Sequence, residues 1–198
     1  MKAKLMLWMA VMMMAACTPM PVATTPATSQ ERAALFEQLK PLEGYWNYYD
    51  AKGKWQGSGR IALTSGGSVL REVMFSGTPH EMTNLYHMDG NALVMTHYCA
   101  SGNQPRLRLP TWHLTKPGEF DFRFASISNW TSGDEYMGRL QLAIADKDHA
   151  SQTWTSYKNG KASAETFELR RQPPRARASE AAAPSCPAPP AAAASTTP

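Results

Sequence analysis

Residues 82–99, MTNLYHMDGNALVMTHYC, alternate between larger apolar side chains and smaller or polar ones on both sides of Asp89-Gly90. Alternation with a period of two is typical of a β-strand with one buried face. Asp-Gly between two such runs is a strong hairpin signal, because both central residues of a type I′ turn need a positive φ. We therefore predict an antiparallel hairpin whose two-residue loop is Asp89-Gly90.

This loop sets the register and so decides which side chains share a face. Met88 is expected to face Asn91, and the face that carries the larger apolar residues is expected to point inward. His87 and His97 fall on opposite faces, so we do not expect them to bind one metal ion together. The predicted inward face consists of Met82, Asn84, Tyr86, Met88, Leu93, Met95, His97 and Cys99.

The period of two extends well beyond this hairpin, from Gly44 to Leu169. Runs typical of strands are separated by turn signals about every 8–12 residues, which predicts about ten strands. Because the connections are short, sequence neighbours are expected to pair in an antiparallel meander. A second two-residue turn, Asn159-Gly160, is expected to place Trp154 opposite Glu165, inside the fold.

One short helix is expected before the strands, from Gln30 to Lys40, with Thr28 or Ser29 as its cap and Pro41 at its end. A short helix followed by a meander predicts an all-β fold, a lipocalin-like antiparallel up-and-down β-barrel. Closure of the barrel removes exposed strand edges. A barrel of this size is filled by its own side chains or holds one small ligand.

The N-terminus is typical of an exported lipoprotein. Lys2 and Lys4 precede a short apolar run, as in a secretory signal peptide. Residues 14–17, MAAC, resemble a bacterial lipobox, which implies cleavage before Cys17 and lipidation of that residue. Since Thr18 rather than Asp follows, the resemblance to Gram-negative lipoproteins implies an anchor in the outer membrane, facing the periplasm. An ordinary signal peptide is the alternative.

Four segments follow from these patterns: a signal peptide (1–16), a lipidated tether (17–29), the barrel domain (30–171) and a Pro/Ala-rich tail (172–198). Tether and tail contain too few large apolar residues to fold, so we expect them to be disordered. The formal net charge is +4, but basic residues at both ends supply it. The barrel domain is close to neutral, which argues against nucleic-acid binding.

His97 and Cys99 are the candidates for chemistry, because residues two apart on a strand point to one face. They suit a Cys–His nucleophile or half of a metal site. No third residue is apparent that orients the pair, and a hydrogen-bonded core histidine beside a buried thiol is the alternative. An exported protein also permits a disulfide between Cys99 and Cys186, with two free thiols as the alternative.

A polar loop follows the second strand of the central hairpin. It contains Asn103, Gln104 and Arg106. Amide side chains both donate and accept hydrogen bonds, and a guanidinium binds carboxylates or phosphates. Such a loop at the mouth of a barrel can hold the polar end of a ligand. The alternative is a turn whose amides bond the loop's own backbone.

Two of these blocks carry a resemblance. Residues 86–99 followed by GNQPR at 102–106 resemble the signature of an uncharacterised bacterial family whose members carry YHxDGxxLxLTHYCxxGNQPR, with Met95 where that pattern has Leu. PLEGYW at 41–46 is similar to the Leu-x-Gly-x-Trp opening of the same group and, more loosely, of calycin barrels. The resemblance implies a lipocalin-like fold over about residues 40–171 and brings no established activity.

We therefore expect a lipid-anchored barrel that binds one small, mostly apolar ligand. No catalytic residue and no complete metal site is predicted, and any cofactor is unknown. The alternatives are a barrel that binds haem or a metal through His97, an enzyme that uses His97 and Cys99, and a filled barrel that serves in envelope structure or assembly. The predicted ligand-binding residues are Tyr86, Met95, His97, Cys99 and Trp154 in the interior, and Asn103, Gln104 and Arg106 at the entrance.

Overall fold

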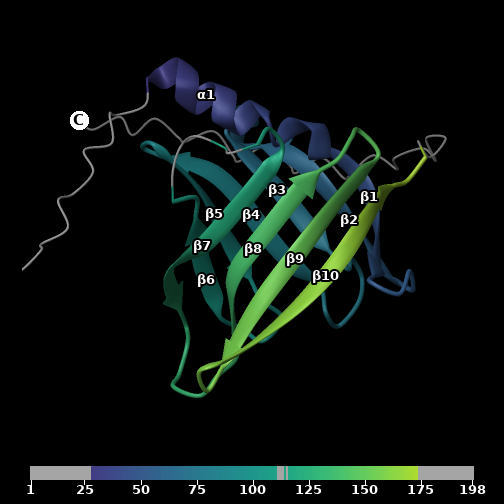
Figure 1. Cartoon of the computed structure of the whole chain (residues 1–198), viewed down its shortest axis with the longest axis vertical. Coiled ribbons are helices and arrows are strands. Elements are labelled where there is room, and N and C mark those ends of the chain that lie inside the picture. Colours follow the sequence, from purple (N-terminus) through teal and green to yellow (C-terminus); the bar gives the residue numbers. More distant parts are fainter. Residues whose placement is uncertain (1–27, 111–113, 115, 174–198) are drawn as a thin grey trace, which may run out of the picture.

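A computed structural model describes residues 28–110, 114 and 116–173 of this chain. These residues form a closed antiparallel barrel of ten strands, preceded by helix α1 (Ser29–Glu37) and the 3-10 turn η1 (Lys40–Leu42) (Figure 1). A second 3-10 turn, η2 (Ser65–Gly67), joins β2 to β3. The strands are β1 (Gly44–Asp50), β2 (Trp55–Thr64), β3 (Val69–Met74), β4 (Met82–Asp89), β5 (Ala92–Tyr98), β6 (Gln104–Arg108), β7 (Glu119–Ser128), β8 (Tyr136–Ile144), β9 (His149–Lys158) and β10 (Lys161–Arg171).

The connectivity is that of an up-and-down meander. Each strand pairs with its neighbours in sequence, and β10 closes the barrel against β1. The predicted all-β barrel with one short helix is thus confirmed. Several predictions concern residues outside the described part of the chain: the signal peptide, the lipidation of Cys17, the disulfide to Cys186 and nearly all of the tail. Within the described ranges, no helix has the length and apolar character needed to cross a membrane.

Helix α1 starts at Ser29, one residue before the predicted Gln30, and ends earlier than predicted. Thr28 is the N-cap: its hydroxyl accepts the Glu31 N–H (3.2 Å), and the Glu31 carboxylate accepts the Thr28 N–H (2.7 Å), which completes a capping box. The helix ends at Glu37 instead of Lys40. Pro41 has no N–H to donate to the carbonyl of Glu37, and its ring clashes with that carbonyl in a continuing helix. The chain therefore tightens into η1.

Helix α1 and η1 close one end of the barrel, the upper end in Figure 1. Apolar side chains of these two elements and of the link between them are buried in the core: Leu35, Phe36, Leu39 and Leu42. The Gln38 side-chain oxygen accepts the Gly118 N–H (3.3 Å), which ties the turn to the β6–β7 connection. Arg32 donates to the Asn91 side chain (3.1 Å) in the β4–β5 loop.

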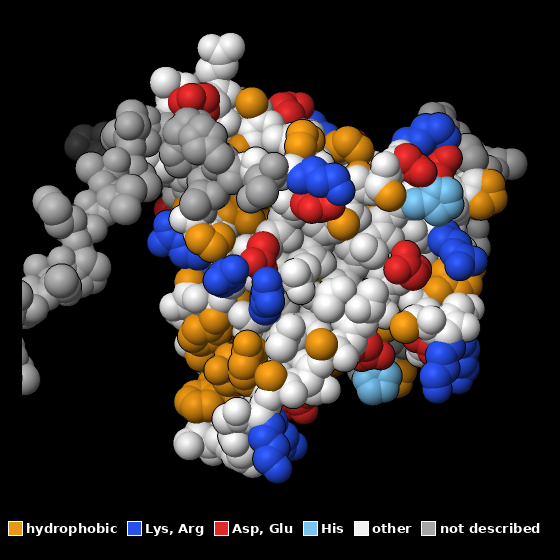
Figure 2. Space-filling model, viewed as in Figure 1, with side chains coloured by type: hydrophobic (Ala, Val, Ile, Leu, Met, Phe, Trp, Pro, Cys, Tyr) orange, Lys and Arg blue, Asp and Glu red, His pale blue; other side chains and the backbone are white. Residues whose placement is uncertain are grey.

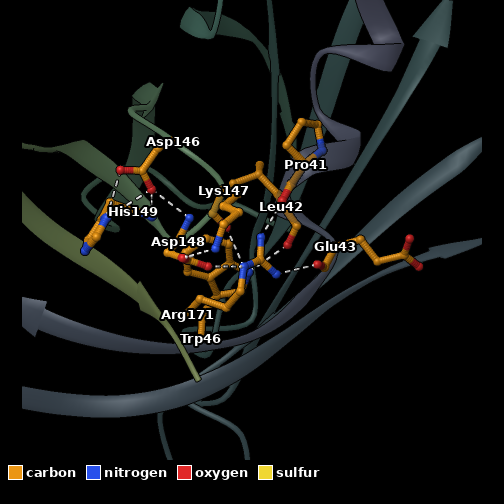
Figure 3. A network of polar contacts seen from close by, with 9 residues as sticks. All are labelled: Pro41, Leu42, Glu43, Trp46, Asp146, Lys147, Asp148, His149 and Arg171. Carbon is orange, nitrogen blue, oxygen red and sulfur yellow. Dashed lines mark hydrogen bonds and ion pairs between the residues drawn. The ribbon is translucent and has the colours of Figure 1, made fainter. Parts of the chain in front are cut away.

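Arg171 fastens the seam between β10 and β1 at this closed end (Figure 3). Its guanidinium donates to the backbone carbonyls of Pro41 (2.5 Å), Glu43 (2.6 Å) and Lys147. The same group lies over the Trp46 ring, 4.3 Å from the ring centroid. One side chain thereby joins η1, the start of β1 and the β8–β9 turn.

The β4–β5 hairpin differs from the predicted register. Asp89 pairs with Ala92, so the two-residue loop is Gly90-Asn91 and Met88 faces Leu93 instead of Asn91. Gly90 has a φ of 57°, whereas Asn91 does not have a positive φ. Glycine at the first central position is typical of a type II′ turn, which competes with the predicted type I′ turn at the same place.

The slip amounts to two residues, so every side chain stays on its predicted face. Asn84, Tyr86, Met95 and His97 are buried inside the barrel as expected. The β9–β10 hairpin has the predicted register: Asn159 and Gly160 both have positive φ, and Trp154 faces Glu165.

Aromatic side chains also gather outside the barrel beside its open end, and Figure 2 shows hydrophobic side chains at this place. The register of β6 and β7 shifts at Arg106/Leu107, and beyond this bulge Phe124 is 43% exposed. Its ring lies 5.2 Å from that of Tyr136, which also contacts Trp130 and Tyr157.

Candidate functional site

The open end of the barrel contains a cavity of about 580 Å³. Its residues come from the ends of strands and connections that lie opposite α1, so the closed half of the barrel is packed and the open half is hollow. The apolar part of the wall consists of Met74, Phe75, Met82, Met137, Trp154 and Phe167. The polar part consists of Gln56, Thr78, His80, His97, Glu135, Ser156, Ser163 and Glu165.

A buried carboxylate lies behind this wall. Glu72 on β3 is fully buried and accepts four hydrogen bonds from neutral donors. One oxygen accepts from the Tyr48 hydroxyl and the Gln152 amide (both 2.7 Å). The other accepts from the Asn84 amide and the Tyr86 hydroxyl (both 2.8 Å). Burying a charge is costly unless its lone pairs are satisfied, and here four donors satisfy them.

The two tyrosines are held as donors. Burial, and next to it the charge of Glu72, raises the pKa of Tyr48 and of Tyr86 well above the usual value. Neither phenol ionises at neutral pH, so both hydroxyls keep their proton for the carboxylate. The barrel core thus contains a stable polar centre in place of a wholly apolar one.

Two arms extend from Glu72 to the cavity wall, each through one amide. Asn84 donates to Glu72, and its oxygen accepts from Nδ1 of His97 (2.7 Å). Gln152 donates to Glu72, and its oxygen accepts from Nε1 of Trp154 (3.1 Å). The two rings pack against each other with centroids 4.9 Å apart. One carboxylate therefore orients the rings of both His97 and Trp154.

This network also determines the tautomer of His97. The Asn84 oxygen is an acceptor, so Nδ1 carries the proton and Nε2 carries a lone pair. Nε2 has no hydrogen-bond partner, and the side chain is only 1% exposed. Burial lowers the pKa of His97 to about 4, so the ring is neutral at neutral pH. The wall thus contains a fixed, unused hydrogen-bond acceptor.

The structure brings only two of the predicted interior residues into the cavity wall, His97 and Trp154. Tyr86 and Met95 are buried in the core and do not line the cavity, and the Tyr86 hydroxyl donates to Glu72. Cys99 is half-buried, is absent from the wall, and accepts a hydrogen bond from the Ser101 hydroxyl (3.1 Å). His97 and Cys99 are therefore not presented to the cavity together.

The predicted entrance residues make other contacts and do not line the cavity. The Asn103 amide is buried and donates to the Glu135 carbonyl (2.9 Å). Gln104 donates to the Gly102 carbonyl (2.6 Å), so its amide supports its own loop. Arg106 forms an ion pair with Asp89 (2.6 Å). Gln104 thus supports its own loop, as in the alternative considered above, whereas Asn103 and Arg106 bond groups outside the loop.

The residues that sequence reasoning missed are Glu72, Tyr48 and Gln152. Strand alternation indicates two of them. Glu72 lies on the same face as the inward Leu70 and Met74, and Gln152, two residues before Trp154, lies on the same inward face as Trp154. Among the described residues, no three His, Cys, Asp or Glu side chains are grouped as ligands of a metal ion.

Comparison with protein-family models matched none to this chain, and a search of curated proteins found no match either. The geometry of the cavity is therefore the basis for a functional proposal.

Proposed function

We propose that the barrel binds one small, mostly apolar ligand in the cavity at its open end, and that neutral His97 accepts a hydrogen bond from it. The observation that carries the proposal is His97, which lines a cavity of about 580 Å³ and whose Nε2 is a buried acceptor without a partner. A buried polar atom left unsatisfied costs about 1–3 kcal/mol. A ligand that donates to Nε2 recovers that free energy.

The surroundings of His97 support a binding role. The cavity combines large apolar side chains with polar groups, two of its rings are held in place by hydrogen bonds, and such a combination is typical of small-molecule sites. The two arms from Glu72 hold the rings of His97 and Trp154 before any ligand arrives, which lowers the entropic cost of binding.

The place of action follows from the N-terminal sequence. We propose that the protein is exported and anchored by acyl chains on Cys17, in the outer membrane with the barrel in the periplasm. Metabolic labelling with a radioactive fatty acid tests the anchor. Label is expected in the wild-type chain and lost in Cys17→Ser.

Native mass spectrometry tests the binding proposal on the full chain, extracted gently from the cell envelope. An adduct of one ligand per chain is expected, released on denaturation. His97→Phe is expected to reduce its occupancy, because the acceptor is lost. His87→Phe is the matched control, since His87 lies on the opposite face and does not line the cavity. A bare mass, together with no uptake of added apolar compounds, contradicts the proposal.

Haem is a second candidate, and the fixed lone pair on Nε2 favours it. An axial histidine binds iron through an unprotonated nitrogen while its other nitrogen donates to an oxygen, as Nδ1 of His97 does to Asn84. An absorbance scan of the same sample separates the two candidates. A Soret band that disappears in His97→Phe supports haem, and its absence with an organic adduct supports the first proposal.

A further inference from the structure

At the inner end of the cavity, the ring N–H groups already donate hydrogen bonds to other side chains. Nδ1–H of His97 is bonded to Asn84, and Nε1–H of Trp154 is bonded to Gln152. What His97 still offers is the lone pair on Nε2. Ser156 is the other polar side chain at this depth, and a hydroxyl takes either role. A ligand atom that meets this wall is therefore best matched when it donates.

The charges around the cavity also disfavour an anion at this depth. No Lys or Arg is found among the described residues of the lining, whose formally charged members are Glu135 and Glu165. Glu72 lies behind both rings, one amide away from each, and no cation is among its hydrogen-bond partners. Charge interactions are strong in a poorly hydrated interior, so a second negative charge here is repelled.

Among the described residues, the Lys and Arg side chains lie outside the cavity lining. Lys158 and Lys161, at the β9–β10 turn, line a neighbouring hollow that shares Glu135 with the mouth. Both lysines are exposed, and exposed charges act weakly over distance in salt solution. They can hold an anionic group at the rim, with the remainder of a molecule inside. They do not change the preference of the inner end for a hydrogen-bond donor over an anion.

We propose that the ligand binds with an uncharged hydrogen-bond donor at the inner end of the cavity, a hydroxyl or an N–H that donates to Nε2 of His97. Carboxylates and phosphates do not bind at this end. The chemical class is an alcohol, a phenol or an amide on an alkyl or aromatic body, which packs on Met82, Trp154 and Phe167. This inference rests on the proposed binding function and specifies the end of the ligand that is buried.

Three matched probes test it: para-hexylphenol, hexylbenzene and para-hexylbenzoate, which differ in one substituent. The full chain carries Cys17→Ser, so that no acyl chain competes for the cavity. Calorimetry gives the affinities, and NMR with isotope-labelled histidine reports on Nε2 of His97. We expect the phenol to bind about tenfold more tightly than hexylbenzene and to shift the Nε2 resonance. The benzoate is expected to leave that resonance in place.

His97→Phe separates the hydrogen bond from the apolar contacts. The phenol is expected to lose its tenfold advantage and bind like hexylbenzene, while hexylbenzene keeps most of its affinity. If this variant does not fold, the Nε2 resonance of the chain with native His97 decides alone.

Two results overturn the inference and leave the binding function intact: equal affinities for phenol and hexylbenzene, or tightest binding of the benzoate with protonation of His97. Failure of all three probes to bind contradicts the binding function itself, and the inference with it.

Discussion

At the scale of single residues, Glu72 sets the chemistry of the cavity without lining it. Its four hydrogen bonds end on two tyrosines and two amides, and the amides orient His97 and Trp154. A network of this kind is strong when every member is satisfied and costly when one member fails. The polarity of the wall therefore depends on a side chain that does not line the cavity.

Glu72→Gln is expected to destabilise the barrel by about 3 kcal/mol, because an amide NH₂ then faces two donors where a carboxylate oxygen accepted them. Urea denaturation measures the free energy of unfolding. Glu168→Gln, an exposed change on β10, is the control and is expected to have little effect. Equal stability of the two variants contradicts the assignment of Glu72 as the centre of the network.

His97 makes stability depend on pH in a defined window. Its pKa is lowered from 6.5 to about 4 in the folded protein, so between these values the unfolded chain binds a proton that the folded chain does not. Stability is therefore complete above pH 6.5 and falls as the pH decreases to about 4, by about 3 kcal/mol in total.

His97→Gln is expected to remove this slope from a series of urea titrations between pH 4 and 6.5. His149→Gln, at an exposed histidine, is expected to retain it. A slope that persists unchanged in His97→Gln means that another group titrates in this window.

The site was partly predictable at this scale. Alternation placed His97 and Trp154 on inward faces, and both lie in the wall. Glu72 and Gln152 were missed because polar residues in a strand pattern are assigned to solvent by default. Their contact forms only when the barrel closes, because Gln152 on β9 reaches Glu72 on β3 across the interior, 80 positions away in the sequence.

At the scale of secondary-structure elements, the two hairpins show what a turn sequence decides. Asn159-Gly160 is flanked by residues that offer no competing turn, and its predicted register is correct. Asp89-Gly90-Asn91 contains two overlapping turns, and the structure has the second. Local preferences differ too little to choose between them, but a slip of two leaves the buried face unchanged.

Gly59 on β2 illustrates how one element makes room for another. A Cβ at this position meets the Val73 carbonyl at 2.3 Å and the Tyr48 ring at 2.8 Å. Gly59→Ala is expected to destabilise the protein by about 2 kcal/mol, because the ring of Tyr48 is displaced from Glu72.

A double-mutant cycle with Tyr48→Phe checks that cause. If both changes act on the Tyr48–Glu72 hydrogen bond, the double variant loses less free energy of unfolding than the two single variants lose together. Strict additivity contradicts it and leaves a purely local clash with Val73 as the cause.

At the scale of the whole molecule, closure is concentrated at one seam. Arg171 joins β10, η1 and the β8–β9 turn, whereas its neighbour Arg170 lies over the Tyr49 ring and is exposed. The barrel class followed from strand number and short connections, but this seam joins residues more than 120 positions apart, and no local pattern indicates it.

Arg171→Lys is expected to destabilise the protein by about 2 kcal/mol, since an ammonium does not reach three carbonyls in the plane of a guanidinium. Arg170→Lys is the matched control, with an expected loss below about 1 kcal/mol. Thermal unfolding of both variants provides the measurement. A larger loss of stability in Arg170→Lys than in Arg171→Lys contradicts the role of Arg171 in closing the barrel.

The capped end of the barrel also governs how this protein can be attached to anything else. Thr28 enters the fold beside α1, and Pro173 leaves it beside Glu43, so both ends of the described chain emerge where the barrel is closed. A tether, a surface or a fused protein joined directly at Thr28 or Pro173 therefore holds the molecule by its closed end. The open end of the barrel then faces away from the support and stays exposed to solvent while the protein is immobilised.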